Sequence, residues 1–421
     1  MTRMKDSGNP WVREIPSDWF EKKLRYLVKL RGEKSVTTDY KKYVGLENIM
    51  SQTGQYVQTG IEVDLTENLT FEVGDILFGK LRPYLRKYWR AEFSGTASSE
   101  FVIIKGSSLN LNFLFWAIQS DSFINDVDSS TYGSKMPRAS WEYMKNIKLP
   151  FPESIEEQTQ IADFLDKKVA QLDKVKSLLE EQINTLENYR QSLIYETVTK
   201  GLDKTVPLKD SGVDWIGQIP EGWEVKKHKY IMSKTKTLCS HYSGQKILSL
   251  TRQGVISRNI ESGKGKMPAS FDGYQFLTRG DLLLCLFDID VTPRCVGVVE
   301  SDGLTSPAYS RFKVSEDSSA YYYYYLFLSM DDDKVLLHLA KNLRNSLTED
   351  DFGDIETIVP SYEEQVIIAN YLNKKTLLID KLIKLKKEQI ENINKQRQAL
   401  IYDYVTGKRR VRWSTKTTTI L

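Results

Sequence analysis

The sequence contains one long stretch twice, and this repetition predicts how the chain folds. Residues 156–200 read EEQTQIADFLDKKVAQLDKVKSLLEEQINTLENYRQSLIYETVTK, and residues 363–407 read EEQVIIANYLNKKTLLIDKLIKLKKEQIENINKQRQALIYDYVTG. At an offset of 207 residues the two copies share Glu-Gln and Ile-Ala near their starts and Leu-Ile-Tyr near their ends. Chance does not produce such a match over this length, so we expect both stretches to have the same structure.

Both copies are predicted to be long helices that pack against each other. Neither contains proline, and Gly407 ends the second. Apolar residues recur every seven positions, which is typical of a coiled coil. The expected helix-packing residues are Leu165, Leu172, Leu179, Leu186 and Leu193 in the first copy and Leu372, Ile379, Leu382, Ile393 and Leu400 in the second. About 45 residues at 1.5 Å each give a rod of roughly 65 Å, and the nearest partner for its apolar stripe is the other copy.

The second seam position of each predicted helix is less uniform than the first. Ile161, Val175 and Tyr189 are expected to fill it in one copy, and Ile368 and Leu382 in the other. Polar residues fall on the same seam, namely Lys168, Gln182, Lys375, Lys386 and Gln389. The matching glutamines either fix the register, as a buried polar residue can, or lie at a widened and partly wet seam.

A second repeated block precedes each stretch of variable sequence. Lys5-Asp-Ser-Gly8, followed by Trp11, Ile15-Pro16 and Trp19, recurs 204 residues later as Lys209-Asp-Ser-Gly212 with Trp215, Ile219-Pro220 and Trp223. The sequence between the repeated blocks diverges, except for anchors such as Gly74-Asp75-Ile-Leu77 and Gly280-Asp281-Leu-Leu283. A repeated frame that holds two unlike inserts indicates a structural frame and inserts that recognise two different things.

The inserts are predicted to be small α+β domains. Residues 20–150 and 224–358 contain short β-branched and aromatic runs separated by turn signals, followed by more helical apolar stretches. The expected divisions are a first recognition domain (1–155), a first spacer helix (156–201), a second recognition domain (202–362), a second spacer helix (363–407) and a basic tail (408–421).

Loops between the predicted strands carry polar side chains suited to contacting DNA. Arg and Lys pair with guanine edges, Asn and Gln with adenine, and hydroxyl groups with phosphate. The candidates are Lys80, Arg82, Tyr84, Ser134, Lys135 and Arg138 in the first insert and Arg252, Gln253, Arg258, Asn259, Lys264, Lys266, Arg294, Arg344 and Asn345 in the second. The alternative for each residue taken singly is a solvated surface side chain. Net charge is only +3, but residues 226–294 hold twelve Lys or Arg against five Asp or Glu.

The sequence lacks the motifs of the common catalytic centres. It contains no P-loop, no HExxH and no cysteine pair with zinc-ligand spacing, so we expect no metal and no cofactor. Glu21-Lys-Lys23 and Glu224-Val-Lys226 resemble nuclease strings but are interpreted as surface charge. His228 and His338 are expected to have ordinary core or surface roles, and Tyr321–Tyr325 to form a half-buried helix or strand face.

The cellular setting is also an expectation from composition. No run of about 18 apolar residues suggests a membrane span, and the polar start shows no signal peptide. Cys239, Cys285 and Cys295 are expected to be free thiols in a reducing cytoplasm.

This layout resembles the specificity subunit of type I restriction-modification systems, over nearly the whole chain. The resemblance rests on two variable domains, each opened by a Lys-Asp-Ser-Gly…Trp…Ile-Pro…Trp block and closed by a Glu-Gln…Ile-Ala helix. It implies an α+β fold with two mixed α/β target recognition domains, separated by two long antiparallel, coiled-coil-like helices in a pseudo-two-fold repeat. One departure is that the loop around Pro83 has no counterpart after Asp281, where Cys285-Leu-Phe287-Asp288 follows.

The resemblance also implies a function. Each domain would read one half of a bipartite double-stranded DNA target, and the helices would set the spacer. Two methyltransferase subunits would dock on the helices, motor-nuclease subunits would complete the complex, and this chain would be non-catalytic. Two other classes compete with this interpretation. An enzyme, a fused nuclease or methyltransferase, would need the missing motifs, and a coiled-coil scaffold that binds only protein would show no salt-dependent DNA affinity.

Overall fold

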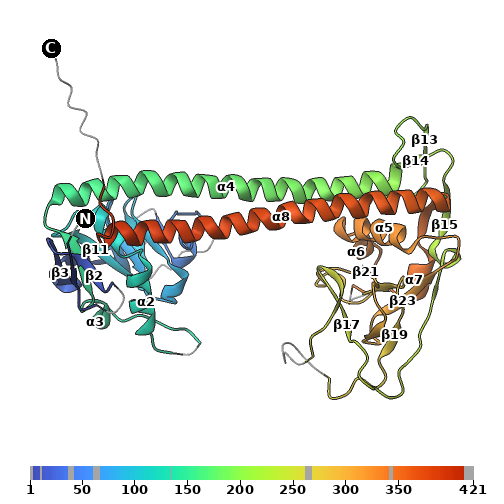
Figure 1. The fold of residues 1–421 in the computed structure, drawn as a ribbon, viewed down its shortest axis with the longest axis horizontal. Coiled ribbons are helices and arrows are strands. Elements are labelled where there is room, and N and C mark those ends of the chain that lie inside the picture. Colours follow the sequence, from blue (N-terminus) through green and yellow to red (C-terminus); the bar gives the residue numbers. More distant parts are fainter. Residues whose placement is uncertain are drawn as a thin grey trace, which may run out of the picture. The chain divides into compact units, whose positions relative to one another are not determined.

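The chain divides into two compact units, each built around parts of the same two long helices. The computed structural model describes residues 3–9, 12–36, 42–59, 67–133, 135–260, 268–340 and 345–411. Unit 1 comprises Met1–Glu180 and Lys387–Leu421, and unit 2 comprises Glu181–Lys386. The long helices are α4 (Ile155–Lys200) and α8 (Tyr362–Val405), and each contributes one part to each unit (Figure 1).

Unit 1 is a mixed α/β structure with two four-stranded sheets. One sheet has the order β4-β11-β8-β9 and is antiparallel throughout; the other has the order β5-β7-β10-β6, in which only β10 and β6 are parallel. The pairs β1-β2 and β12-β3 complete it. The strands are β1 (Met4–Asp6), β2 (Glu14–Pro16), β3 (Trp19–Lys23), β4 (Val28–Leu30), β5 (Lys34–Val36), β6 (Tyr43–Val44), β7 (Glu67–Phe71), β8 (Ile76–Gly79), β9 (Tyr88–Arg90), β10 (Gly95–Ala97), β11 (Phe101–Ser107) and β12 (Lys148–Pro152). The helices are η1 (Leu24–Tyr26), η3 (Leu46–Asn48), η4 (Pro83–Leu85), α1 (Leu111–Ala117), α2 (Asp121–Ser129) and α3 (Trp141–Met144).

Unit 2 repeats the frame of unit 1 but not its second sheet. The sheet β16-β23-β20-β21 corresponds to β4-β11-β8-β9, and the pairs β13-β14 and β15-β24 correspond to β1-β2 and β3-β12. In place of the second sheet stand the pairs β17-β18 and β19-β22. The strands are β13 (Leu208–Asp210), β14 (Gln218–Pro220), β15 (Glu224–Lys227), β16 (Met232–Lys234), β17 (Leu248–Thr251), β18 (Gly254–Ser257), β19 (Gln275–Leu277), β20 (Leu282–Leu284), β21 (Val296–Val298), β22 (Gly303–Thr305), β23 (Ser310–Val314) and β24 (Glu356–Val359). The helices are η5 (His228–Tyr230), α5 (Ala320–Asp332), α6 (Val335–Leu339) and α7 (Glu349–Asp354).

The repeated Gly-Asp pair starts the same strand in both units. The Asp75 carboxylate accepts a hydrogen bond from the backbone N–H of Glu72 and lies 2.6 Å from Arg31 Nε. Asp281 accepts the backbone N–H of Thr278 in the same way and lies 2.7 Å from the Nε of Arg311. Arg31 directly follows β4, whereas Arg311 lies in β23, so the two inserts neutralise equivalent buried carboxylates by different routes.

The repeated Gln near the start of each long helix joins three segments of its unit. The buried Gln158 donates to the Pro152 carbonyl at 2.8 Å and accepts from the backbone N–H of Asn110, the N-cap of α1, at 2.8 Å. Gln365 donates to the Pro360 carbonyl at 3.0 Å and accepts from the N–H of Ser319, the N-cap of α5, at 2.8 Å. A buried amide with both ends bonded explains why this residue is repeated.

The two long helices run antiparallel inside each unit. In unit 1, Phe164 and Tyr404 have ring centroids 4.5 Å apart, and Arg397 Nε lies 3.3 Å from Asp173 Oδ1. In unit 2, Arg190 Nε lies 3.4 Å from Asp380 Oδ1. The two ion pairs are copies of each other, because Arg190 and Asp173 recur 207 residues later as Arg397 and Asp380.

The hydrophobic cores include the ends of both helices. In unit 1, Ile161 and Leu165 of α4 and Ile401 and Val405 of α8 are buried in one cluster with the main sheet. In unit 2, Val198 of α4 and Leu372 of α8 have the equivalent place. The sheet-containing part of each unit is therefore packed on two helix segments that are distant in sequence. Among the described residues, no helix is both long enough and apolar enough to cross a membrane.

The buried residues along the helices agree with the first predicted seam but place the second seam elsewhere. Leu165 and Ile379 are buried, and the remaining predicted leucines and isoleucines are at least partly buried, except Leu382, which is 40% exposed. Val175 and Tyr189 are also exposed, whereas Ile161 and Ile368 are buried, so the expected second seam was right at the start of each helix and wrong further along. The second seam instead lies one residue further along and contains Val169, Lys176, Ile183 and Arg190 in α4 and Thr376, Ile383, Ile390 and Arg397 in α8.

Gln182 and Gln389 do not form buried register-setting contacts. Both side chains are exposed, and Gln182 Oε1 accepts a hydrogen bond from Lys386 Nζ at 2.6 Å. Lys168 and Lys375 are exposed as well. Of the two alternatives that the sequence left open, the structure corresponds to polar residues along a wet edge of the helix pair.

Replacing Gln365 by Ala should destabilise unit 2 by about 3 kcal/mol. The substitution leaves the Ser319 N–H and the Pro360 carbonyl without partners in a buried site, at a cost of roughly 1–3 kcal/mol each. Hydrogen exchange of the α5 and β24 amides measures the effect. Asn370→Ala, at an exposed position on the same helix, is the control; equal protection in both variants would contradict the role given to Gln365.

Unit 2 should lose stability as the pH falls from about 6.5 to 4. His228 is fully buried, its Nδ1 lies 2.9 Å from the Phe352 carbonyl oxygen, and burial lowers its pKa from 6.5 to about 4. Below pH 6.5 the unfolded chain takes up a proton that the folded chain does not, which costs up to about 3 kcal/mol at pH 4. Unfolding free energies measured across this range should depend less on pH in His228→Phe, whereas His338→Gln, at an exposed position, should match the parent chain.

Candidate nucleic-acid interface

Two loops of unit 1 that the sequence singled out lie side by side. The chain leaves β8 at Lys80, whose carbonyl accepts the N–H of Ala139 at 2.9 Å. The N–H of Arg82 donates to the Pro137 carbonyl at 2.8 Å. Arg82 adopts a left-handed conformation (φ 51°), which turns the chain sharply into η4. The segments 80–86 and 132–138 therefore form one surface, and Figure 1 shows the chain extending beyond the end of α2 before it returns to α3.

The exposed side chains of this surface are aromatic, apolar and basic. Tyr84, Tyr132 and Met136 are 50%, 66% and 53% exposed, and Lys135 is exposed beside them. Lys80 and Arg82 are partly buried, and Arg82 Nη2 donates to the Lys135 carbonyl at 3.2 Å. Such a surface can stack on sugars or bases and neutralise phosphate. Ser134, also predicted here, lies outside the described residues.

Arg138 is held by an acidic partner. Its Nε and Nη2 lie 3.1 Å and 2.5 Å from the two carboxylate oxygens of Glu100. A bidentate pair of this kind fixes the planar guanidinium group. We therefore assign Arg138 to positioning the 132–138 loop against β11.

Unit 2 builds the same juxtaposition from different side chains. The Leu286 carbonyl accepts the N–H of Leu347 at 2.8 Å, and the N–H of Ile289 donates to the Asn345 carbonyl at 3.1 Å. The first bond corresponds to that of Lys80 with Ala139, and the second to that of Arg82 with Pro137, with its donor one residue further along the chain. The loop after β20 is therefore the structural counterpart that the sequence comparison did not find.

This counterpart loop presents residues that sequence reasoning missed. Val291 is 73% exposed and Phe287 is 37% exposed, and the acidic Asp288 and Asp290 lie between and beside them. The repeated Gly-Asp pair could have identified this loop in the sequence. Arg82 and Asp288 lie at the same distance from Asp75 and Asp281, and both have a left-handed backbone conformation. The two surfaces differ in charge, as expected of two unlike readers.

The other predicted residues of unit 2 are divided between two places. Arg252 and Gln253 are exposed at the turn of the β17-β18 hairpin, and Arg258 and Asn259 follow β18, each with a contact inside the chain. Arg294 lies at the end of the β20-β21 loop, where its Nη1 is 3.4 Å from the hydroxyl of Tyr324 on α5. Asn345 contributes its carbonyl to the loop pair described above. Lys264, Lys266 and Arg344 lie outside the described residues.

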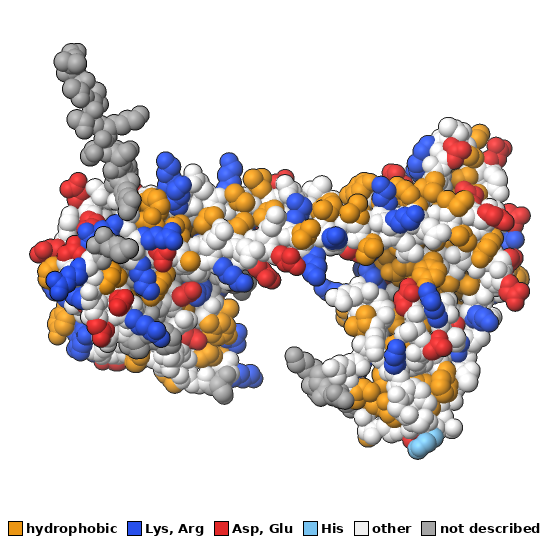
Figure 2. All heavy atoms as spheres, in the orientation of Figure 1, with side chains coloured by type: hydrophobic (Ala, Val, Ile, Leu, Met, Phe, Trp, Pro, Cys, Tyr) orange, Lys and Arg blue, Asp and Glu red, His pale blue; other side chains and the backbone are white. Residues whose placement is uncertain are grey.

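Charge on the visible face is mixed rather than concentrated. Figure 2 shows Lys and Arg side chains interspersed with Asp and Glu over both units. A nucleic acid would thus meet local basic groups on loops instead of one broad basic face.

The acidic residues of the two nuclease-like strings have structural partners. Glu21 lies 3.6 Å from Lys148 on the paired strand, and burial raises its pKa. Glu224 accepts a hydrogen bond from Lys226, which lowers its pKa. No group of three metal-ligating side chains occurs among the described residues.

The tyrosine run and the cysteines also belong to the core of unit 2. Tyr321–Tyr325 lies in α5, where the buried Tyr322 donates its hydroxyl to the Val198 carbonyl at 2.9 Å. Cys239, Cys285 and Cys295 are free and buried. Burial raises the pKa of Cys285 and Cys295, which makes them poor nucleophiles.

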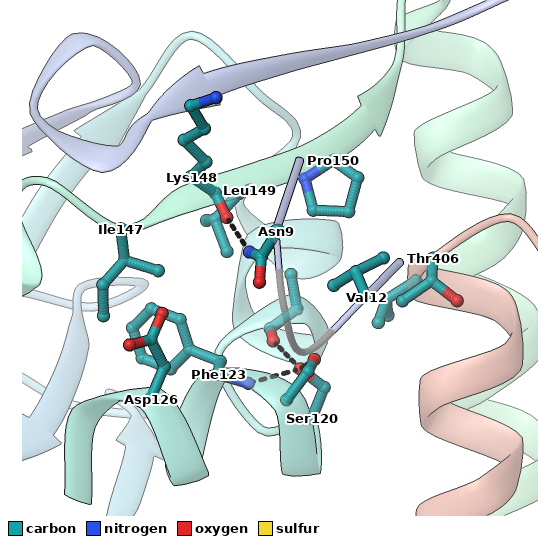
Figure 3. Close-up of a pocket in the computed structure, with 13 residues that line it drawn as sticks. Asn9, Val12, Ser120, Phe123, Asp126, Ile147, Lys148, Leu149, Pro150 and Thr406 are labelled. Carbon is teal, nitrogen blue, oxygen red and sulfur yellow. Dashed lines mark hydrogen bonds between the residues drawn. The ribbon is translucent and has the colours of Figure 1, made fainter. Parts of the chain in front are cut away.

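A small pocket marks the point where the opening block of unit 1 meets α2, β12 and the end of α8. Asn9 donates to the Lys148 carbonyl at 3.4 Å, and Val12 and Thr406 close the other side (Figure 3). Its volume of about 10 Å³ is enough for one water molecule. This pocket is a packing junction and not a ligand site.

Comparison with known proteins defines the class of this arrangement. Residues 16–188 match the model of the type I restriction modification DNA specificity domain. The chain is 26% identical to the MjaVIII type I restriction enzyme specificity subunit of Methanocaldococcus jannaschii, over 94% of each chain. It is 23% identical to the EcoDI specificity subunit of Escherichia coli over 45% of this chain and 44% of that one.

Solved structures show the same fold. A chain in a structure that concerns complex assembly and conformational transition of the type I R-M system is similar with a TM-score of 0.69 and 18% identity, over 94% of this chain and 99% of that one. The HsdS subunit from Thermoanaerobacter tengcongensis has a TM-score of 0.50 and 18% identity, over 94% and 98%. The resemblance seen in the sequence is confirmed: residues 16–188 match the specificity-domain model, and the relatives named above are type I restriction enzyme specificity subunits.

Glu100→Gln and Arg138→Gln should weaken binding to target DNA by a similar factor, because both release the same loop. Titration of DNA with the assembled complex measures this. Lys135→Ala should weaken binding without loosening the loop. If Arg138 touched DNA directly, removal of the Glu100 charge would leave affinity unchanged or raise it, and the positioning role would be wrong.

Proposed function

We propose that this chain reads a bipartite double-stranded DNA target, with unit 1 recognising one half-site and unit 2 the other. The observation that carries the proposal is the pair of equivalent loop junctions. The backbone hydrogen bonds of the two junctions are alike, but their side chains differ. Unit 1 presents Lys135 and Tyr84, and unit 2 presents Asp290 and Val291. Equal scaffolds with unlike reading surfaces suit two different base sequences.

The chain acts as a non-catalytic specificity subunit in this proposal. The match of residues 16–188 to the specificity-domain model supports it, and the acidic and histidine side chains described above have structural partners. Methyl transfer then belongs to methyltransferase subunits and DNA cleavage to motor-nuclease subunits of the full complex. We place that complex in the cytoplasm, where buried free cysteines remain thiols.

Exposed apolar residues on the long helices support docking of two methyltransferase subunits. Val175 and Leu178 of α4 in unit 1 are each 47% exposed, and Leu382 and Leu385 of α8 in unit 2 are 40% and 47% exposed. These are the same positions of the repeat, 207 residues apart. Two copies of one partner need two like surfaces, and exposed apolar groups at such surfaces favour protein contact.

The lengths of the helices support a role as a ruler. Helix α4 has 46 residues and α8 has 44, which correspond to roughly 69 Å and 66 Å at 1.5 Å per residue. The alternative, a scaffold that binds only protein, leaves the differing loops without a purpose and predicts DNA affinity that does not depend on salt.

Exchanging residues 20–150 for the corresponding residues of a relative should change one half-site of the target and preserve the other. Most of β3 and β12 moves together in such a hybrid, so these strands can still pair, and α4 and α8 keep their ion pairs with each other. Sequencing of methylated DNA from cells that express the hybrid with its methyltransferase gives the answer. A change in both half-sites would refute the modular assignment.

Inserting seven residues after Glu180 in α4 and seven after Lys386 in α8 should lengthen the unspecified gap. Seven residues keep the apolar stripe in phase and add about 10.5 Å, or roughly three base pairs at 3.4 Å each. The same methylation readout applies. Altered half-sites with an unchanged gap would count against the ruler.

A further inference from the structure

A cavity in unit 1 lies between the recognition domain and α8. Its volume is about 490 Å³. Gln52, Arg86 and Asp121 line it from the recognition domain, and Lys395, Arg397 and Gln398 line it from α8. Arg86 directly follows η4, so the cavity adjoins the 80–86 loop.

The cavity carries an excess of positive charge. Arg86, Lys395 and Arg397 oppose the single lining carboxylate of Asp121. Arg86 uses its Nη2 on Asp121 at 2.5 Å. Lys395 is exposed and has no ion-pair partner among the described residues. Because Arg86 is paired with Asp121 and Arg397 with Asp173, Lys395 is the lining cation whose charge stays available for an anion.

Arg397 is buried with unused hydrogen-bond donors. Its side chain is 5% exposed and lies 5.9 Å from the ring centroid of Trp116. Nε approaches Asp173 to 3.3 Å, but neither Nε nor Nη1 makes a hydrogen bond to the described residues. Buried donors without acceptors are costly, and a guanidinium group pairs best with a planar or tetrahedral oxyanion. Gln398 Oε1 is buried without a donor, and rotation of that amide by half a turn presents its NH₂ group instead.

The repeat shows that the frame does not require this charge. The positions of Asn394 and Lys395 in unit 1 are taken by Glu187 and Asn188 in unit 2. The arginine itself is kept in both copies: Arg190 pairs with Asp380 in unit 2 as Arg397 does with Asp173 in unit 1. These two residues have a net charge of +1 in unit 1 and −1 in unit 2. The difference indicates a ligand that binds at this place in unit 1 only.

Two residues in the cavity wall opposite α8 have strained backbone conformations. Gln52 and Arg86 both have left-handed φ angles, 69° and 56°, and the Gln52 N–H donates to the Arg86 carbonyl at 3.0 Å. Such conformations are maintained only where the surrounding structure determines them, so the geometry of this wall is fixed before any ligand arrives.

We propose that this cavity binds a phosphate group, and that in the assembled protein the group is a backbone phosphate of the DNA. The second clause rests on the proposed function. A phosphate contact adjoining the 80–86 loop would position the duplex for that loop without reading bases. Lys395 supplies a point charge and Arg397 two donors, a combination suited to phosphate oxygens.

The first test uses inorganic phosphate and does not depend on DNA. The thermal unfolding midpoint of the full chain is measured in phosphate and in chloride at equal ionic strength, for the parent, Lys395→Glu and Lys384→Ala. Lys384 is an exposed lysine of α8 outside the cavity. The phosphate-specific rise should appear in the parent and in Lys384→Ala and be lost in Lys395→Glu. An equal rise in all three would overturn the proposal.

The second test identifies the source of the phosphate. The affinity of the assembled complex for DNA is measured against salt concentration, and Lys395→Glu should lower the slope of log K against log salt by about one unit for target and non-target DNA alike. A lost phosphate effect with an unchanged slope would keep the phosphate site but overturn DNA as its source. If the parent shows no salt-dependent DNA binding, the proposed function fails while the first test still decides the cavity.

Discussion

The antiparallel pairing of α4 and α8 inside each unit is the constraint on which the rest of the structure depends. Each hydrophobic core contains residues from both helices, so neither recognition domain is complete on one of them. The pairs Arg397–Asp173 and Arg190–Asp380 hold the helices in register, with the arginine from one helix and the aspartate from the other. Removing one partner of such a pair costs about 3–5 kcal/mol when the remaining charge is buried.

The same constraint brings the first repeated block and the end of α8 together in unit 1. Gly407 ends α8 in a left-handed conformation against Pro16 and Trp19, where a Cβ would come within 2.5 Å of the proline ring. Arg410 then pairs with Asp18. Gly201 has the equivalent place at the end of α4, beside Pro220 and Trp223. The repeated opening block is thus a platform for the end of a long helix in both units, which explains why it recurs before each insert.

Much of the frame could be predicted from the sequence, because its contacts depend on residues that recur. The seven-residue spacing of Leu165 to Leu193 identified the helices and one seam. The second seam was misplaced because the next buried position in a heptad can lie three or four residues after each leucine. Only Val169 and Ile183, which are more apolar than Lys168 and Gln182, favoured the correct spacing of four residues in α4. The loop after β20 could not be matched to the 80–86 loop from the sequence. The two loops resemble each other in their backbone hydrogen bonds, which do not depend on the identity of the side chains. The cavity at Arg397 could not be predicted from the sequence, because the residues that line it are distant from one another along the chain.

The central claim is that one repeated frame carries two unlike DNA readers. The most direct measurement is a methylation map of DNA from cells that express this chain with a matching methyltransferase subunit, compared with the methyltransferase alone. The account predicts a new split motif, two half-sites of different sequence with a fixed unspecified gap. No new methylation from a folded and associated complex, or a single continuous motif, would contradict it.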